Sequence, residues 1–284
     1  MGDPAGIIVE MIHRPESIPI ELADLCLVTA VDIEFKTATD LLNSKIFSND
    51  SKIKICQGLF ANRRVTVLQC GMGARGFAEW LKNHLNECSY DALIVVGLAG
   101  GLDGALKAGD AVIYDRCYLY DRCSLGDSEP DLNGSKEKQS ACDEKASIHC
   151  NDSLSRYLLD LLQASEHRSA CGLGITVPRI ITDAKDKVRF GADYMALAVD
   201  MESFHVLRVC ADFGLPASVL RVISDEVDDD LPDFNYASGT EGSFSNWRMF
   251  LAMTTRPAAS LKFLLGMRAV MESLRTNLKT ILSA

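Results

Sequence analysis

Short apolar runs alternate with helix-like segments along most of this chain, and this alternation constrains its fold more than any other feature. Buried strands are expected at 23–31, 52–60, 63–70, 90–102, 108–121, 168–182, 193–200 and 215–225. Helices are expected at 35–46, 77–88, 153–165, 203–214 and 256–282. Short apolar runs are typical of strands covered on both faces, and their alternation with helices predicts an α/β fold built on a largely parallel sheet.

Two segments stand outside this alternation. Residues 1–22 precede the first apolar run and form an N-terminal extension. Residues 121–150 are rich in polar and charged side chains, and long stretches of this kind in α/β proteins usually lie on the surface. We therefore expect a polar surface excursion there.

Composition and charge indicate which kinds of partner the protein binds and in which cellular compartment it is expected. The 284 residues carry a net charge of -10 and no basic run, which argues against a nucleic-acid partner. No signal peptide and no transmembrane segment is apparent, so a reduced, cytoplasmic protein is expected. The cysteines show no metal-binding spacing, and neither a metal nor a cofactor is predicted. Six of them lie in or beside apolar segments and are expected to be buried: Cys26, Cys56, Cys70, Cys88, Cys171 and Cys210.

Polar residues and glycines gather where the expected strands end. Glu34 follows the first strand, the sequence GLAGG at 97–101 ends another, and Met201 with Glu202 closes a third. Ser224 and Asp225 end the last strand. In parallel sheets ligands bind beyond the carboxyl ends of the strands, so these positions predict a small-molecule site.

Each of these signals also has a purely structural interpretation. Asp32 and Asp200 could cap the helices that follow them, and Glu202 could offset a helix dipole. Asp225 stands directly at a strand end, whereas the acids at 226–230 read as an ordinary acidic loop. The glycines at 71–76 lack the spacing of a dinucleotide fingerprint, so they predict a tight turn beside a ligand more than a dinucleotide site.

Several motifs together resemble a known family. The sequence VDMES at 199–203, followed by GLPASVLRVISDEVDD at 214–229, resembles the purine nucleoside phosphorylase/uridine phosphorylase superfamily. TAVDIEF at 29–35 and VVGLAGGLDGALKAGDAVIYD at 95–115 extend the resemblance, which covers most of the chain from Leu25 onward. It is nearest to the 5′-methylthioadenosine/S-adenosylhomocysteine nucleosidases and the hopanoid-associated nucleoside phosphorylases. It implies a single domain over 1–284, a three-layer α/β/α sandwich around a mixed, largely parallel sheet.

The resemblance also implies roles for individual residues. Asp225 would protonate N7 of a purine, and Glu34 would help to activate an attacking water. Glu202 would bind the ribose hydroxyls. The remaining residues implied to contact substrate are Met201 under the sugar, Ile180 and Ile181 beside the base, and Gly97, Leu98 and Ser224.

One departure from the family bears on the nucleophile. The phosphorylases typically carry an arginine before a glycine and a hydroxyl residue at the end of the central strand. Here Val95 and Val96 precede Gly97, and Leu98 replaces the hydroxyl residue. Phosphate recognition needs arginine, lysine or aligned N–H donors, so hydrolysis is favoured. Phosphate remains possible, because Arg75 or Arg179 could substitute.

The expected activity is therefore an N-ribosyl hydrolase acting on a purine nucleoside, with adenine as the expected base. The alternatives are a phosphorylase and a non-catalytic nucleoside-binding protein; a dinucleotide-dependent dehydrogenase lacks its fingerprint. A small-molecule nucleoside is the expected partner. Members of this superfamily usually form dimers, trimers or hexamers, so the chain is also expected to form a homo-oligomer, with a dimer favoured.

Overall fold

A computed structural model describes residues 22–51, 53–74, 76–120, 147–232 and 257–284. Most of the N-terminal extension and residues 121–146 of the expected excursion lie outside this range. None of the helices in the described ranges is long and apolar enough to span a membrane.

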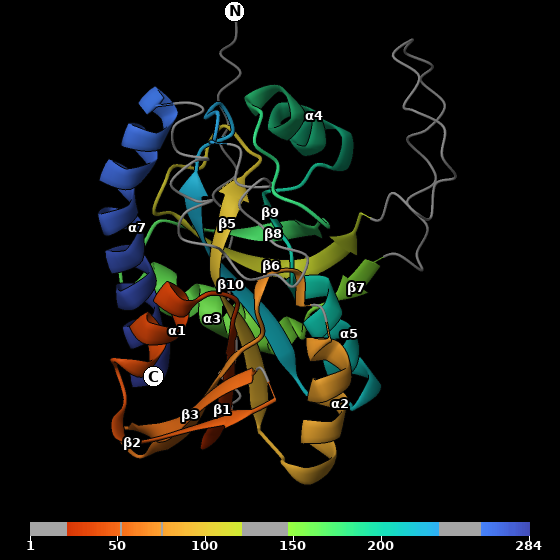
Figure 1. The fold of residues 1–284 in the computed structure, drawn as a ribbon, viewed down its shortest axis with the longest axis vertical. Helices are drawn as coiled ribbons and strands as arrows, with labels where there is room; N and C mark the ends of the chain where they lie inside the picture. Colours follow the sequence, from red (N-terminus) through yellow and green to blue (C-terminus); the bar gives the residue numbers. More distant parts are fainter. Residues whose placement is uncertain (1–21, 52, 75, 121–146, 233–256) are drawn as a thin grey trace, which may run out of the picture.

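The strands form one mixed sheet in the order β10-β6-β8-β9-β5-β1-β4-β3-β2, with β7 beside β6 (Figure 1). The strands are β1 (Asp24–Thr29), β2 (Asn43–Asp50), β3 (Ile53–Phe60), β4 (Arg63–Gln69), β5 (Ala92–Gly101), β6 (Ala111–Leu119), β7 (Ser147–His149), β8 (Ser169–Thr176), β9 (Ala198–Asp200) and β10 (Ala217–Asp225).

The sheet closes on itself, because β10 pairs with β5 as well as with β6. Five strands, β5, β10, β6, β8 and β9, therefore form a ring, and β1, β4, β3 and β2 extend outward from β5. The predicted α/β class and mixed sheet are confirmed, whereas the closure was not predicted from the sequence.

Strand β5 changes its neighbour along one edge. Its first half pairs in parallel with β1, as far as the pairing of Val28 with Val95. Its last residues pair antiparallel with β9, from Gly100 onward. No strand of the described chain pairs with the intervening stretch on this edge. A point where a strand exchanges neighbours is where α/β sheets commonly open to ligands.

Helices cover both faces of the sheet (Figure 1). Helices α1 (Asp32–Thr39), α3 (Asp152–Ala164) and α7 (Pro257–Ser283) bury residues such as Phe35, Leu158 and Leu274 in one apolar cluster. Helices α2 (Phe77–Glu87) and α5 (Ser203–Asp212) bury Phe77 and Leu207 in a second cluster. These layers on the two faces confirm the predicted three-layer arrangement, and their apolar contacts supply most of the core.

Helix α4 (Ala184–Tyr194) lies beyond the strand ends that the sequence marked as polar (Figure 1). It packs very tightly at Gly191, where an added Cβ would lie 2.1 Å from the carbonyl oxygen of Leu102. A third apolar cluster, which includes Ile175 and Val199, joins its residues Phe190 and Tyr194 to the sheet. The backbone contact at Gly191 therefore fixes α4 against the end of β5.

Four predicted segments were wrong in their bounds. The strand expected at 168–182 ends with β8 at Thr176, before Ile180 and Ile181. The helix expected at 35–46 ends at Thr39, and β2 follows at Asn43, because antiparallel pairing with β3 overrides the weak helical pattern. The strand expected at 193–200 is only the short β9, at Ala198–Asp200. Helix α4, which precedes it, was not predicted, because this helix buries Lys187 instead of an apolar stripe. The expected excursion ends early, since β7 pairs with β6.

The expected burial of the cysteines holds in part. Cys26, Cys56, Cys70 and Cys210 are buried, Cys88 is half-buried and Cys171 is exposed. Cys171 lies in the first half of β8, and the continuously buried part of that strand begins only at Leu173. All eight cysteines within the described ranges are unpaired thiols.

The contact at Gly191 gives a stability prediction. Gly191→Ala should lower the free energy of unfolding by about 1–3 kcal/mol, because the added methyl group meets backbone that cannot move aside. Gly266→Ala in α7 is the matched control, since nothing lies within 4 Å of its added Cβ. Removing a helical glycine there should stabilise by roughly 0.5–1 kcal/mol. Urea unfolding of both variants measures the difference, and equal effects would contradict the tight packing of α4.

Candidate active site

The three acids singled out from the sequence are buried and follow three neighbours of β5. Glu34 stands in the first turn of α1 after β1, Glu202 between β9 and α5, and Asp225 at the end of β10. Their exposed fractions are 3%, 5% and 4%. Since burying a carboxylate without partners is costly, the partners of each acid define what the site can do.

Glu34 is held by backbone N–H groups. Its Oε2 accepts hydrogen bonds from the amides of Ala30 and Val31 at 2.8 and 3.1 Å. Its Oε1 accepts one from the amide of Leu98 at 2.8 Å. Leu98 lies in the stretch of β5 that has no strand on this edge, so the side chain of Glu34 takes the place of a missing strand. The capping role considered for Asp32 thus falls to Glu34, while Asp32 is exposed and pairs with Lys54.

Glu202 belongs to a buried charge cluster around Arg221. This arginine lies in the middle of β10 and is 1% exposed. Its Nε lies 3.1 Å from Oδ2 of Asp200, and its Nη2 lies 3.1 Å from Oε2 of Glu202. The other oxygen of Glu202 accepts a hydrogen bond from the amide of Gly73 at 3.0 Å. One guanidinium therefore neutralises part of the charge of two buried carboxylates.

Asp200 has the capping role that was one of the two interpretations open for it. Its Oδ1 accepts hydrogen bonds from the amides of Glu202 and Ser203, both at 3.1 Å, at the start of α5. The hydroxyl of Thr176 donates to the same oxygen at 2.8 Å. Asp200 thus joins the start of α5 to Arg221, and the side chain of Glu202, the N-cap residue, makes no capping hydrogen bond to this helix.

The glycine of β5 at position 97 lets these charges approach one another. An added Cβ would lie 2.5 Å from Oε1 of Glu34 and 2.9 Å from Nη1 of Arg221. The side chains of Glu34 and Arg221 therefore both lie in the space that a side chain at position 97 would fill. The absence of a side chain at Gly97 brings Glu34 next to the cluster of Arg221. Gly73 of the expected glycine turn has a related role, since its amide donates to Glu202 and an added Cβ would lie 3.9 Å from the methyl carbon of Met201.

Asp225 has a separate set of partners. Its Oδ2 lies 2.8 Å from Nζ of Lys187, and its Oδ1 accepts a hydrogen bond from the hydroxyl of Ser224 at 2.5 Å. The same carboxylate faces Gly100 of β5, whose added Cβ would lie 3.4 Å from Oδ2. Asp225 is therefore placed three residues along β5 from the cluster at Gly97.

Burial shifts the pKa of two of these acids upward. Removal from water raises the pKa of Glu202 to about 7, although the nearby Arg221 acts in the opposite direction. Burial also raises the pKa of Asp225, while the charge of Lys187 and the hydroxyl of Ser224 oppose the rise. A carboxyl group whose pKa is raised can carry a proton nearer to neutral pH, as a general acid must.

The other predicted residues fall near these acids in different ways. Leu98 is half-buried against the cluster of α1 and α7, and its backbone amide donates to Glu34. Met201 and Ile181 pack against the apolar cluster below α4, and Ile180 is half-buried. Ser224 is half-buried, with its hydroxyl also 3.1 Å from the carbonyl oxygen of Ala99.

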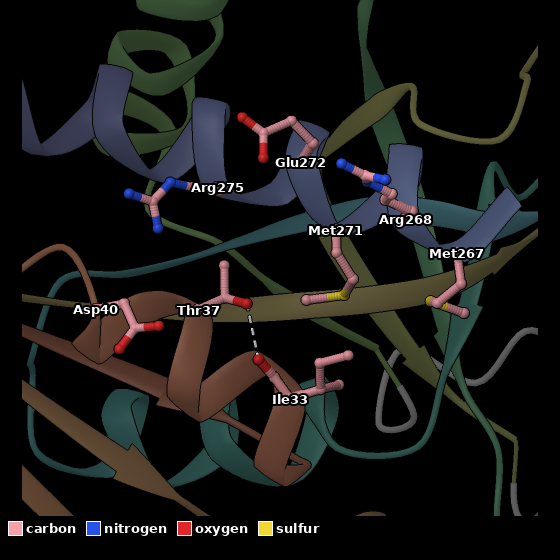
Figure 2. A pocket seen from close by; sticks show the side chains of 8 residues that line it. All are labelled: Ile33, Thr37, Asp40, Met267, Arg268, Met271, Glu272 and Arg275. Atoms are coloured by element: carbon pink, nitrogen blue, oxygen red, sulfur yellow. Dashed lines mark hydrogen bonds between the residues drawn. The ribbon is translucent and has the colours of Figure 1, made fainter.

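Two surface pockets are lined by residues other than Glu34, Glu202 and Asp225. Figure 2 shows one of about 290 Å³ between α1 and α7, where Ile33 and Thr37 face Met267 and Met271. A second, of about 530 Å³, lies near the amino ends of the strands beside Asp24 and Arg64. That Glu34, Glu202 and Asp225 enclose one nucleoside-sized hollow stays a prediction.

Sequence reasoning missed two of the charged residues that organise this region. Arg221 left a signal, because a charged side chain within the apolar run ASVLRVI requires a buried partner. Lys187 left none, because it lies among other polar residues of 183–193. Among the described residues, no group of three or more His, Cys, Asp or Glu side chains is arranged to hold a metal ion.

The fold and the site define an α/β protein with a mixed sheet, part of which closes into a ring, and with buried acids after the strands beside β5. We compared this chain with known families. The family model described as the phosphorylase superfamily matches residues 24–252. The chain therefore belongs to the phosphorylase superfamily, as its motifs predicted.

Individual relatives are distant but cover most of the chain. A 5′-methylthioadenosine/S-adenosylhomocysteine nucleosidase of an Exiguobacterium species is 24% identical over 234 residues, which are 81% of this chain and 97% of the relative. The crystal structure of the nucleosidase of the same name from Campylobacter jejuni has a TM-score of 0.65 at 15% identity, covering 92% of this chain and 97% of that one. Futalosine hydrolase of Helicobacter pylori has a TM-score of 0.59 at 18% identity, covering 87% and 97%.

The buried charge cluster gives a second stability prediction. Arg221→Met should lower the free energy of unfolding by about 3–5 kcal/mol, because it leaves the carboxylates of Asp200 and Glu202 without their counter-charge. Arg208→Met on α5 is the control, since this arginine is exposed and lies 3.6 Å from Asp212. Its effect should stay within about 0.5 kcal/mol. A loss below about 1 kcal/mol for Arg221→Met would show that the cluster is not held by charge pairing.

Proposed function

We propose that this protein is a purine nucleosidase, which cleaves the N-glycosidic bond of an adenine nucleoside with water as the nucleophile. The observation that carries the proposal is the set of three buried acids beside β5, with partners that differ at each one. The base is inferred from the names of the nucleosidases that the chain resembles.

The spacing along β5 supports a ligand with two distinct ends. Glu34 and the cluster of Arg221 face Gly97, and Asp225 faces Gly100. Three residues of a strand span about 10 Å. A nucleoside with its sugar near Gly97 and its base near Gly100 would place the bond to be broken between the two groups of acids.

Departure of the base requires a proton, and Asp225 would supply it. In this proposal the bond between C1′ and the base nitrogen breaks as the proton of Asp225 moves to N7 of the purine. The upward shift of the pKa of Asp225 supports this role, because the acid must carry its proton when substrate binds.

Glu34 and Glu202 would act on the sugar side. As the base leaves, positive charge develops on the ribose ring, and a nearby carboxylate lowers the energy of that state. Glu202 would accept hydrogen bonds from the ribose hydroxyls above Met201, and Glu34 would take the proton of the water whose oxygen forms the new bond to C1′. The products are the free base, which carries the proton from Asp225, and the free sugar, which carries the hydroxyl of the water. Glu34 then releases its proton to solvent and Asp225 takes one up before the next turnover.

Water is favoured over phosphate on electrostatic grounds. The only guanidinium of the described cluster, that of Arg221, is already paired with Asp200 and Glu202. With Glu34 beside it, three carboxylates face one cation, and such a site disfavours an entering phosphate anion. Arg179 is exposed, and Arg75 lies outside the described residues. Phosphorolysis is the second candidate and remains an outcome of the test.

The first test measures release of free base from a panel of purine nucleosides, with and without phosphate. We expect base release at the same rate in both conditions, with free ribose or its 5′-substituted form as the second product. Release that depends on phosphate, with formation of a sugar 1-phosphate, would establish the phosphorylase instead. Binding of nucleosides without any base release would favour the non-catalytic binding protein.

The second test separates the two ends of the site by substitution. Asp225→Asn should abolish base release and leave nucleoside binding largely intact, because it removes the proton and keeps the shape. Glu202→Gln should weaken both binding and turnover, by about 2–5 kcal/mol, because a buried charged hydrogen bond is lost. Asp228→Asn, in the exposed part of the acidic loop, is the matched control and should match the parent protein. Unchanged turnover in the first two variants would refute both assignments.

A further inference from the structure

Lys187 is a buried ammonium group that the proposed reaction does not yet use. Its side chain is 0% exposed, and its Nζ lies 2.8 Å from Oδ2 of Asp225. The same nitrogen also donates to the carbonyl oxygen of Glu226. Burying a lysine is costly unless its charge is paired, so this contact is the reason that the side chain can stand there.

The helix that carries Lys187 is fixed at several points. Gly191 packs against the backbone of Leu102, as described above. The amide of Ala184, at the start of α4, donates to Oδ1 of Asp230 at 2.9 Å. The amide of Leu231 donates to the carbonyl oxygen of Thr182 at 2.8 Å. These contacts join α4 to the loop after β10, so the backbone of Lys187 is held in a fixed position relative to Asp225.

We propose that Lys187 is the positioning residue of Asp225: its ammonium group holds Oδ2, leaves Oδ1 as the oxygen that carries the transferable proton, and sets the pH range in which Asp225 is protonated. This inference deepens the proposed function, since it rests on Asp225 as the acid.

The surroundings of Oδ1 suit a proton that comes and goes. The hydroxyl of Ser224 lies within hydrogen-bond distance of both Oδ1 and the carbonyl oxygen of Ala99, and it has one hydrogen to donate. When Asp225 is ionised, Ser224 donates to Oδ1. When Asp225 is protonated, Oδ1 donates to Ser224, which turns its own hydrogen to Ala99. No heavy atom has to move, whereas a proton on Oδ2 would face the ammonium group.

The charged groups around Asp225 set the sign of the expected pH effect. Lys187 on α4 and the hydroxyl of Ser224 lower the pKa of Asp225, and Asp229 of the following loop raises it. Glu226 is paired with Lys107 at 2.7 Å, so its charge is largely balanced. Loss of Lys187 removes the largest of the lowering causes. The pKa of Asp225 should then rise further, and the activity that depends on its proton should persist to higher pH.

The first experiment compares pH profiles of base release by the full chain and by Lys187→Met. The high-pH limb of kcat/KM should move upward by about 1–3 pH units. The plateau of kcat should fall by about 10- to 100-fold, because Asp225 is no longer oriented, with little change in KM. Lys185→Met, an exposed position on the same helix, is the matched control and should keep the parent profile. An unmoved limb in Lys187→Met overturns the proposal.

A second experiment reads Asp225 without any substrate. In protein labelled with ¹³C at the aspartate carboxyl groups, the resonance of Asp225 is assigned as the one absent from Asp225→Asn. Its titration should move to higher pH in Lys187→Met and stay near the parent in Lys187→Arg. If Lys187→Met does not fold, Lys187→Gln gives the same comparison, because it also removes the charge. An unchanged titration overturns the role of Lys187 even if nucleosides are cleaved. A shifted titration in a protein that releases no base supports that role and rejects the proposed function alone.

Discussion

The exchange of neighbours along β5 is the constraint on which the rest of the site depends. This strand loses β1 after Val95 and gains β9 only at Gly100. A buried amide left without a partner in between would cost free energy, and the carboxylate of Glu34 satisfies the amide of Leu98. The glycine at position 97 lets Glu34 and Arg221 lie against the strand. Charged side chains therefore come together at the part of β5 that has no neighbouring strand on this edge.

The charges themselves are stable there because each has a partner. Arg221 neutralises part of the charge of Asp200 and Glu202, and backbone amides hold Glu34. The balance remains negative, which suits a ligand that develops positive charge and disfavours an anion. The same cluster therefore ties the stability of the ring of strands to the chemistry proposed for it, because losing Arg221 would disturb both.

The partners of Asp225 come from other elements than those of Glu34 and Glu202. Helix α4 brings Lys187 to it across the end of the sheet, and Ser224 and Ala99 provide a hydroxyl and a carbonyl oxygen on its other side. Two acids that follow strands next to β5 thus experience different surroundings, with Glu202 beside a guanidinium and Asp225 beside a buried ammonium. Such differences let similar carboxyl groups take different roles in one site.

The sequence by itself determined the fold class, the family and the positions of the acids, because short apolar strands with acids and glycines at their ends are local patterns. It did not determine β2 or α4, since the first depends on pairing with β3 and the second buries a lysine instead of an apolar stripe. It marked Glu34, Glu202 and Asp225 but not their partners. The pairing of Arg221 with Asp200 and Glu202, and of Lys187 with Asp225, joins residues 19 to 38 positions apart in the chain. Only the tertiary structure decided these contacts, because the closure of β10 onto β5 and the docking of α4 bring the charges together.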